Sequence, residues 1–479
     1  MFSYVCVRSV NLLSVKKDMR ICKVKNLLLY LLVTSLPFYG FSVINLGERG
    51  VPFHWIFASS LILFFFLDTL LLRKKIKINW IGLIVLFFAS SAILSLIGIF
   101  TESKNRLVSY FTLFSQYLLC ILTFFTISNL RVSVKYIENL FKTWVFVAFI
   151  VGLYGVYQGL ARIFHLPFSS VILTNPSYSP YQRFGGYGAN PFLRVTSIFG
   201  EPSWYGAYLV PPIFVLLVAL LFKQDKNILF KHQFVNYFLL IFLLFALIQA
   251  GSIGAYATFL GVGFIMLLRE RLLYRIKFIK VSFIVLFGVS LVNLLLEIYG
   301  ISVVSFAFRK IMKLIRAPFS IIFSQKIIYV ADLVYRLEVI SSIFSTWAKQ
   351  PLIYQIFGAG LNSLETHPIQ VRSRLVTATA SAYTQVLMDQ GILGLIILLV
   401  LVISILRKLA VVQKILLKKQ KTMNENKIAI LITLLSISYY VIWCDAINML
   451  ARSLDFARWF NFSLATLIIF KTKEFIKKR

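Results

Sequence analysis

Charged residues are scarce in this chain, and acidic residues are the scarcest of them. Only 14% of the 479 residues are charged, with 17 Asp plus Glu against 50 Lys plus Arg, whereas 59% are hydrophobic. Soluble domains average about 25% charged residues, so the composition excludes an ordinary water-soluble protein. The sequence also has no internal repeat, no glycine-rich nucleotide-binding loop and no G-x-S-x-G element, which argues against the enzyme classes built on them.

Cysteine and histidine are too few and too dispersed for a metal cluster. The two long loops contain no cysteine, so no disulfide framework is expected. No two histidines have the i, i+4 spacing that would put two metal ligands on one helix face. We therefore expect neither a metal site nor a cofactor.

Long apolar runs are what the sequence has in abundance. About twelve segments are long enough to cross a roughly 30 Å hydrocarbon core as helices. The predicted fold class is therefore an all-α polytopic membrane protein with about twelve transmembrane helices. The predicted spans are 27–45, 52–72, 78–100, 107–129, 143–164, 198–222, 233–250, 252–268, 279–300, 380–406, 428–448 and 454–470.

The excess of Lys and Arg fits the positive-inside rule better than a nucleic-acid partner. The formal net charge is +33, and most cations fall in short segments between spans, without a nucleic-acid-binding signature. Both termini are thus predicted to be cytoplasmic, and the expected partner is the lipid bilayer. The segments predicted inside are 1–26, 73–77, 130–142, 223–232, 269–278, 407–427 and 471–479.

The spans divide the chain into alternating membrane and loop regions. Leu27–Ile44 follows basic residues, as in a signal peptide, but it is of span length and lacks an A-x-A-like cleavage site. Met19 precedes a compact basic flank, so translation from Met19 is a hypothesis. The predicted regions are a cytoplasmic segment 1–26, spans within 27–164, an outer loop 165–197, spans within 198–300, a large outer loop 301–379 between spans nine and ten, spans within 380–470, and a basic tail 471–479.

The first candidate site lies where the loop 165–197 meets the sixth span. Arg194 and Glu201 flank the membrane boundary there, and Glu201 precedes Pro202 and Ser203. Ionisable residues at such a depth are costly, so they are candidate functional residues. The alternative is an ion pair between Arg194 and Glu201 that only fixes the helix end.

The large outer loop carries the other candidates. Arg309, Lys313 and Arg316 share one face of an amphipathic helix within 303–316, which either anchors to anionic headgroups or holds a phosphate. A second helix, 327–349, carries Asp332, Arg336 and Glu338, of which Asp332 and Arg336 could form a simple surface salt bridge. Further cations follow the helix, and His367 is more typical of a solvated loop histidine than of a base. These residues are His367, Arg372 and Arg374.

Three blocks resemble the bacterial O-antigen polymerase and O-antigen ligase superfamily, whose members are polytopic C-type glycosyltransferases. They are R-x-x-x-I-F-G-E-P-S at residues 194–203, a block ending in F-G-x-G at 351–360, and S-x-Y-x(5)-D-Q-G-I-L-G at 381–394. Each block alone is weak, but their order and the number of spans fit the family plan. The resemblance covers roughly residues 140–410.

The resemblance implies glycosyl transfer at the outer face of the bacterial inner membrane. In that family the donor is an undecaprenyl-diphosphate-linked glycan, and an acceptor sugar hydroxyl displaces the lipid diphosphate without a nucleotide or a required metal. Such chemistry needs cations beside the diphosphate and a base near the hydroxyl. The resemblance assigns Arg194 and Arg336 to the diphosphate, while Glu201 either orients an arginine or accepts the proton.

The other candidate substrate-binding residues are chosen for their charge or aromatic rings and not because they match a family motif. Tyr187 and its aromatic neighbours would suit sugar rings, although interfacial aromatic belts explain them equally well. The cations Arg309, Lys313, Arg316, Arg372 and Arg374, with His367, are placed by charge alone. A chain-length regulator is a further partner that the resemblance implies.

One departure from the family pattern favours a polymerase over a ligase. Ligases typically carry a histidine just before the tenth span, where this sequence has Ser381, Ala382 and Tyr383. We therefore predict a polymerase that joins repeat units into O-antigen, capsular or exopolysaccharide. A ligase that transfers polymer to lipid A core is one alternative. The other is a transporter or flippase of a lipid-linked saccharide, for which Asp68 and Asp445, in or near spans, would be the relevant charges.

Overall fold

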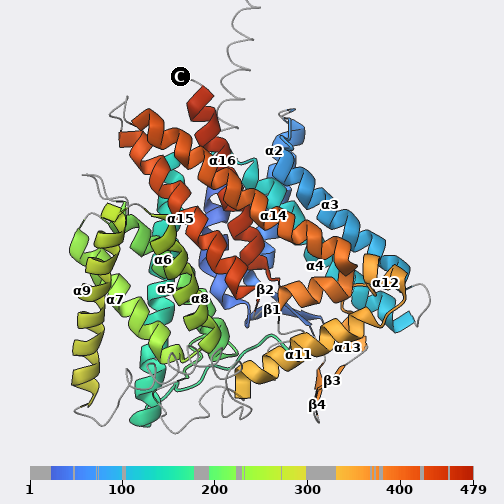
Figure 1. Cartoon of the computed structure of the whole chain (residues 1–479), viewed down its shortest axis with the longest axis horizontal. Helices are drawn as coiled ribbons and strands as arrows, with labels where there is room; N and C mark the ends of the chain where they lie inside the picture. Colours follow the sequence, from blue (N-terminus) through green and yellow to red (C-terminus); the bar gives the residue numbers. More distant parts are fainter. Residues whose placement is uncertain are drawn as a thin grey trace, which may run out of the picture.

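The chain is an all-α, multi-pass membrane protein (Figure 1). The computed structural model describes residues 23–46, 49–71, 73, 75–99, 104–176, 192, 194–222, 229–230, 232–270, 272–297, 331–366, 369–371, 374–376, 381–420, 426–450 and 454–477. Among them, eight helices are long and apolar enough to cross a membrane. They are Phe53–Leu71, Trp80–Gly98, Leu107–Ser128, Val134–Ile163, Pro202–Leu221, Gln233–Ala250, Ala382–Gln420 and Lys427–Asn448.

Eight of the twelve predicted apolar runs coincide with a described helix of membrane-crossing length, and several helices extend beyond the predicted bounds. Thus α5 begins nine residues before the predicted residue 143, and α14 continues past residue 406. Lys, Arg and Glu are good helix formers, so a helix need not stop where the hydrocarbon does. The long helices are α2 (Phe53–Leu71), α3 (Trp80–Leu94, extended by η2, Ser95–Gly98), α4 (Lys104–Ser128), α5 (Val134–Ile163), α6 (Pro202–Leu221), α7 (Gln233–Ala250), α8 (Ile253–Arg269), α9 (Leu272–Glu297), α14 (Ala382–Gln420), α15 (Asn426–Asn448) and α16 (Phe456–Lys477).

The predicted span 27–45 is not one continuous helix. A helix covers 23–35, the 3-10 turn η1 (Leu36–Phe38) follows, and β1 (Ser42–Leu46) then pairs antiparallel with β2 (Arg49–Pro52). Pro37 lacks a backbone N–H and therefore cannot continue the helix. The prediction of one spanning helix over 27–45 therefore does not hold for the second half of the run, which forms a turn and a strand.

The two ends of the bundle differ in what they carry. Figure 1 shows the short elements of the large loop gathered at one end and the C-terminus at the opposite end. We call the first the loop end and the second the tail end. The loop-end elements are α11 (Ala331–Ala348), α12 (Leu352–Phe357), α13 (Ser363–Thr366), β3 (Ile369–Val371) and β4 (Arg374–Val376), with β3 antiparallel to β4.

Helix α15 joins two groups of helices in the core. It packs on α6 and α8 on one side and on α14 and α16 on the other. Phe214 of α6 stacks on Tyr440 of α15, with ring centroids 6.4 Å apart, and both side chains are fully buried. Burial of such large rings stabilises the packing of α6 against α15.

Candidate functional site

The segment around Arg194 is held to the bundle by two glutamines. Gln158 of α5 accepts hydrogen bonds at Oε1 from the backbone N–H groups of Thr196 and Ser197, both at 2.9 Å. Gln249, at the end of α7, donates from Nε2 to the carbonyl of Phe192 at 3.1 Å. Both glutamines are fully buried, and leaving those backbone groups unpaired there would be costly. The loop backbone is therefore fixed from two helices.

Two glycines of α5 allow this close approach. A Cβ at Gly155 would overlap the Tyr205 ring, and one at Gly159 would overlap the Gln249 side chain and lie 3.0 Å from the Phe192 carbonyl oxygen. Both glycines lie one turn apart on one helix face. Two glutamines inside otherwise apolar spans are the sequence signal that could have indicated this contact.

Arg194 itself is half-buried and lacks an acidic partner in the described parts of the chain. Its backbone N–H donates to the Gln249 carbonyl at 2.9 Å, and its φ of 58° lies in the left-handed region, which is unfavourable for an arginine. No carboxylate among the described residues lies within ion-pair distance of its guanidinium, and its Nε is buried without a hydrogen-bond partner there. Within the described residues, the guanidinium charge is therefore not neutralised by an acid.

Glu201 does not form the ion pair with Arg194 that the sequence left open. Its Oε2 accepts a hydrogen bond from the Ser203 hydroxyl at 2.7 Å, at the first turn of α6. Glu201 is the N-cap residue and Pro202 the first helical residue, so the E-P-S block forms a helix start in which the carboxylate faces the positive end of the helix dipole. The acid and the arginine are thus positioned independently.

The second and third sequence blocks lock together at a bend in α14. Gly391 has φ 68° and ψ −170°, which breaks the helix, and Gly358 has φ 88°. A Cβ on Gly358 would overlap the Asp389 carbonyl group, and one on Gly391 would overlap the Ile356 carbonyl group. Only glycine allows the two backbones to approach in this way. The blocks 351–360 and 381–394 therefore have a structural role at this contact.

Asp389 completes that contact. Its Oδ1 accepts hydrogen bonds from both the backbone N–H and the hydroxyl of Ser363, at 3.0 and 2.9 Å. The Ala359 N–H also donates to the Met388 carbonyl at 2.9 Å. Helix α11 packs on the same bend, since Ile343 and Met388 belong to one small buried cluster. The bend thus orients the helix that carries Arg336.

The start of α14 is tied to the end of α15. Ser381 donates from its hydroxyl, and Ala382 from its backbone N–H, to the Met449 carbonyl, both at 2.9 Å. Tyr383 donates to the Ala446 carbonyl at 3.0 Å. At the position where ligases typically have a histidine, this chain therefore uses its side chains to join two helices.

A buried polar cluster beside this junction was not predicted as a site. Asn461 donates to Asp445 at 2.9 Å, and Arg458 pairs with Asp455 at 2.6 Å, while Asp445, Arg458 and Asn461 are each at most 5% exposed. From sequence, Asp445 was predicted only as a charge in or near a span. An arginine at the start of the apolar run 454–470 was the available signal.

The structure does not describe the side chains of the remaining predicted site residues. Arg336 lies in α11 and Arg374 in β4, and the structure describes their backbone but not their side chains. The others lie outside the described residues: Tyr187, Arg309, Lys313, Arg316, His367 and Arg372.

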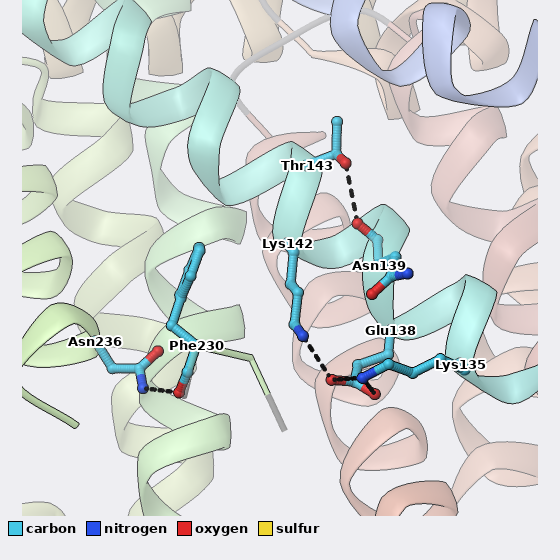
Figure 2. A network of polar contacts seen from close by, with 7 residues as sticks. All are labelled: Lys135, Glu138, Asn139, Lys142, Thr143, Phe230 and Asn236. Carbon is cyan, nitrogen blue, oxygen red and sulfur yellow. Dashed lines mark hydrogen bonds and ion pairs between the residues drawn. The ribbon is translucent and has the colours of Figure 1, made fainter. Parts of the chain in front are cut away.

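Several charges at the tail end form ion pairs with one another. Figure 2 shows Glu138 between Lys135 and Lys142 on the first turns of α5, with N–O distances of 3.0 and 2.9 Å. Asn236 donates to the Phe230 carbonyl at 3.2 Å beside this network. Lys25 pairs with Asp68 at 2.5 Å.

The tail-end connections are also joined across the bundle. Lys77, between α2 and α3, donates to Glu474 of α16 at 3.1 Å, and Lys471 approaches the same carboxylate at 3.6 Å. Partial burial raises the pKa of Glu474, but these two cations outweigh it and leave the pKa below its ordinary value. Glu474 therefore stays ionised, and the pairing persists at neutral pH.

No protein-family model matches this chain, and no curated protein matches it either. The resemblance to the polymerase and ligase superfamily is therefore a hypothesis that rests on the three sequence blocks.

Proposed function

We propose that this protein is a metal-independent glycosyltransferase, a polymerase that joins undecaprenyl-diphosphate-linked oligosaccharide repeat units. Its product would be an O-antigen, a capsular polysaccharide or an exopolysaccharide. A protein that controls chain length is a candidate partner.

The observation that carries the proposal is the setting of Arg194. Two buried glutamines fix the backbone of its loop, while its guanidinium has no acidic partner in the described chain. A purely structural arginine at a membrane boundary would be expected to pair with an acid such as Glu201, but Glu201 bonds to Ser203 instead. A pre-positioned cation suits a substrate that brings its own negative charge.

In the proposed reaction the acceptor hydroxyl oxygen attacks the anomeric carbon of the donor sugar. The bond from that carbon to the lipid diphosphate breaks, and the diphosphate leaves with the bonding electron pair. Arg194 and Arg336 stabilise the charge that develops on the diphosphate, and Glu201 accepts the hydroxyl proton. The other cations of the large loop and the aromatic residues near Tyr187 would hold the sugars and phosphates.

We further propose that the protein lies in the bacterial inner membrane with its loop end outside. Two described segments that contain several Lys residues, the α2 to α3 connection and the end of α16, lie together at the tail end. By the positive-inside rule the tail end, with both termini, would be cytoplasmic. The active site would then face the side on which lipid-linked repeat units are polymerised.

The proposal is tested by the surface-polysaccharide profile of a deletion strain complemented with wild type, Arg194→Ala or Arg131→Ala. Arg131 is an exposed arginine at the opposite end of α5 and serves as the matched control. We expect the deletion and Arg194→Ala to give only a single-repeat band, while wild type and Arg131→Ala restore the ladder. Accumulation of lipid-linked polymer without any acceptor-linked band would indicate a ligase, and an unchanged profile would contradict glycosyl transfer.

A second variant separates the two roles of Glu201. Glu201→Gln keeps an oxygen that can accept from Ser203 but removes the proton acceptor. We expect this variant to insert normally and to lose at least about 100-fold in polymer formation, as for removal of a general base. Polymer formation at the wild-type rate would leave Glu201 with only its contact to Ser203 at the start of α6.

A further inference from the structure

Arg162, in the last turn of α5, lies on the helix face that holds the Arg194 loop. That face is marked by contacts along its length: Val151 accepts from the Ser197 hydroxyl at 2.7 Å, and Gln158 accepts from two backbone N–H groups. An α-helix turns 100° per residue, so residues 151, 158 and 162 fall within about 40° of one another. Arg162 therefore extends the row of loop-binding residues by one turn, beside Gly159.

Arg162 shares two features with Arg194. Each guanidinium has a buried nitrogen without a hydrogen-bond partner in the described chain, Nη1 in Arg162 and Nε in Arg194. No Asp or Glu occurs between Glu138 and Glu201, and the acid that follows Arg194, Glu201, accepts from Ser203 instead. A buried guanidinium nitrogen without a partner is unfavourable, so the pair favours an anion that comes from elsewhere.

We propose that Arg162 and Arg194 together form a binding site for a phosphoryl anion at the loop end of α5. Guanidinium groups bind phosphoryl oxygens through two parallel N–H donors, and two such forks match the charge of a diphosphate. That the natural ligand is a lipid-linked diphosphate rests on the proposed function, whereas the phosphoryl chemistry does not. A phospholipid headgroup is the other source of the same chemical group.

A merely structural role for Arg162 makes a different prediction. As a cation in the last turn of α5, Arg162 would interact with the negative end of the helix dipole, and lysine would serve equally well. A phosphoryl site needs the planar fork, which lysine lacks. The conservative variant Arg162→Lys therefore separates the two roles.

The test is binding of inorganic diphosphate to the purified full-length protein, measured by calorimetry in uncharged nanodiscs. We expect wild type and Arg131→Gln to bind equally, Arg162→Gln and Arg194→Gln to bind at least tenfold more weakly, and Arg162→Lys to bind several-fold more weakly. Where Arg162→Gln does not yield folded protein, Arg162→Lys decides. Wild-type affinity in Arg162→Lys and Arg162→Gln, or no binding by wild type, would overturn the site.

Competition then identifies the source of the phosphoryl group. Displacement of inorganic diphosphate by undecaprenyl diphosphate but not by phosphatidylglycerol supports the site as part of the donor-binding machinery. Displacement by phosphatidylglycerol supports the same site as a lipid headgroup contact. A wild-type protein that binds diphosphate through Arg162 but transfers no sugar would retain this site and refute the proposed function. A protein that forms polymer but binds diphosphate equally well with and without the Arg162 side chain would retain the proposed function and refute this site.

Discussion

The two ends of the helix bundle use their charges differently. At the tail end, acids meet lysines: Asp68 with Lys25, and Glu138 with Lys135 and Lys142. At the loop end, polar side chains bind backbone groups or one another, as Gln158 does with the Arg194 loop.

The difference separates charges that stabilise the protein from charges that are available to a ligand. The tail-end lysines Lys25, Lys135 and Lys142 already have acidic partners, so these pairs need no substrate. Arg162 and Arg194 have no acidic partner in the described chain, although both are half-buried. A protein retains such groups at a cost in stability, which a substrate anion would offset.

Substitution at the contact between Gly358 and α14 is expected to cause the largest loss of stability. Gly358→Ala adds a Cβ that overlaps the Asp389 carbonyl group at a left-handed backbone position, so we expect a loss of about 3 kcal/mol in unfolding free energy. Thermal unfolding in detergent measures it. In the control, Gly263→Ala in α8, the new Cβ meets Phe278 at an ordinary 3.8 Å and should be neutral or stabilising. Equal effects would contradict the interlocked bend.

The next largest effect is expected from the hydrogen bonds between Gln158 and the Arg194 loop. Gln158→Ala leaves two buried N–H groups unpaired, and we expect a cost of about 1–3 kcal/mol in stability together with shorter polymer. The matched control is Gln233→Ala, an exposed glutamine at the tail end of α7, which should change neither. Normal polymer from a destabilised Gln158→Ala protein would show that the loop geometry does not matter for activity.

Substitution of Glu138 tests the tail end, where we expect a smaller loss of stability. Glu138→Gln removes the charge between Lys135 and Lys142, but both lysines reach solvent, with 65% and 26% of their side chains exposed. The expected loss of stability is about 1 kcal/mol, with polymer length unchanged. A loss of polymer without a loss of stability would show that Glu138 acts in polymer formation, which would contradict the assignment of function to the loop end.

The pair of Lys77 and Glu474 should matter least. Their side chains are 67% and 47% exposed, and exposed ion pairs typically contribute below about 1 kcal/mol. We expect Lys77→Ala to unfold at nearly the wild-type temperature in low salt and in high salt. A marked drop confined to low salt would show that this pair holds the tail end together.

The fold class was predictable because span length and hydrophobicity depend on local sequence alone. The spans of α6 and α7 were predicted to within a few residues, whereas the helix ends of α5 and α14 were not, since charged residues can extend a helix into water. Arg194 and Glu201 were singled out as candidates because charge at a membrane boundary is costly.

The partners of these residues could not be predicted from sequence. The bonds from Gln158 to Thr196 and from Asp389 to Ser363 join residues 38 and 26 positions apart. Their pairing depends on how helices pack, which periodicity does not encode. For the same reason the glycines of the F-G-x-G and D-Q-G blocks were read as family markers, and their mutual contact emerged only in three dimensions.

The most direct test is transfer by purified protein in nanodiscs, with a fluorescent lipid-linked repeat unit as both donor and acceptor. We predict that wild type and Lys77→Ala form polymer at similar rates, and that Arg194→Ala, although folded, forms none. Polymer from Arg194→Ala at the wild-type rate would contradict a role for Arg194 in glycosyl transfer.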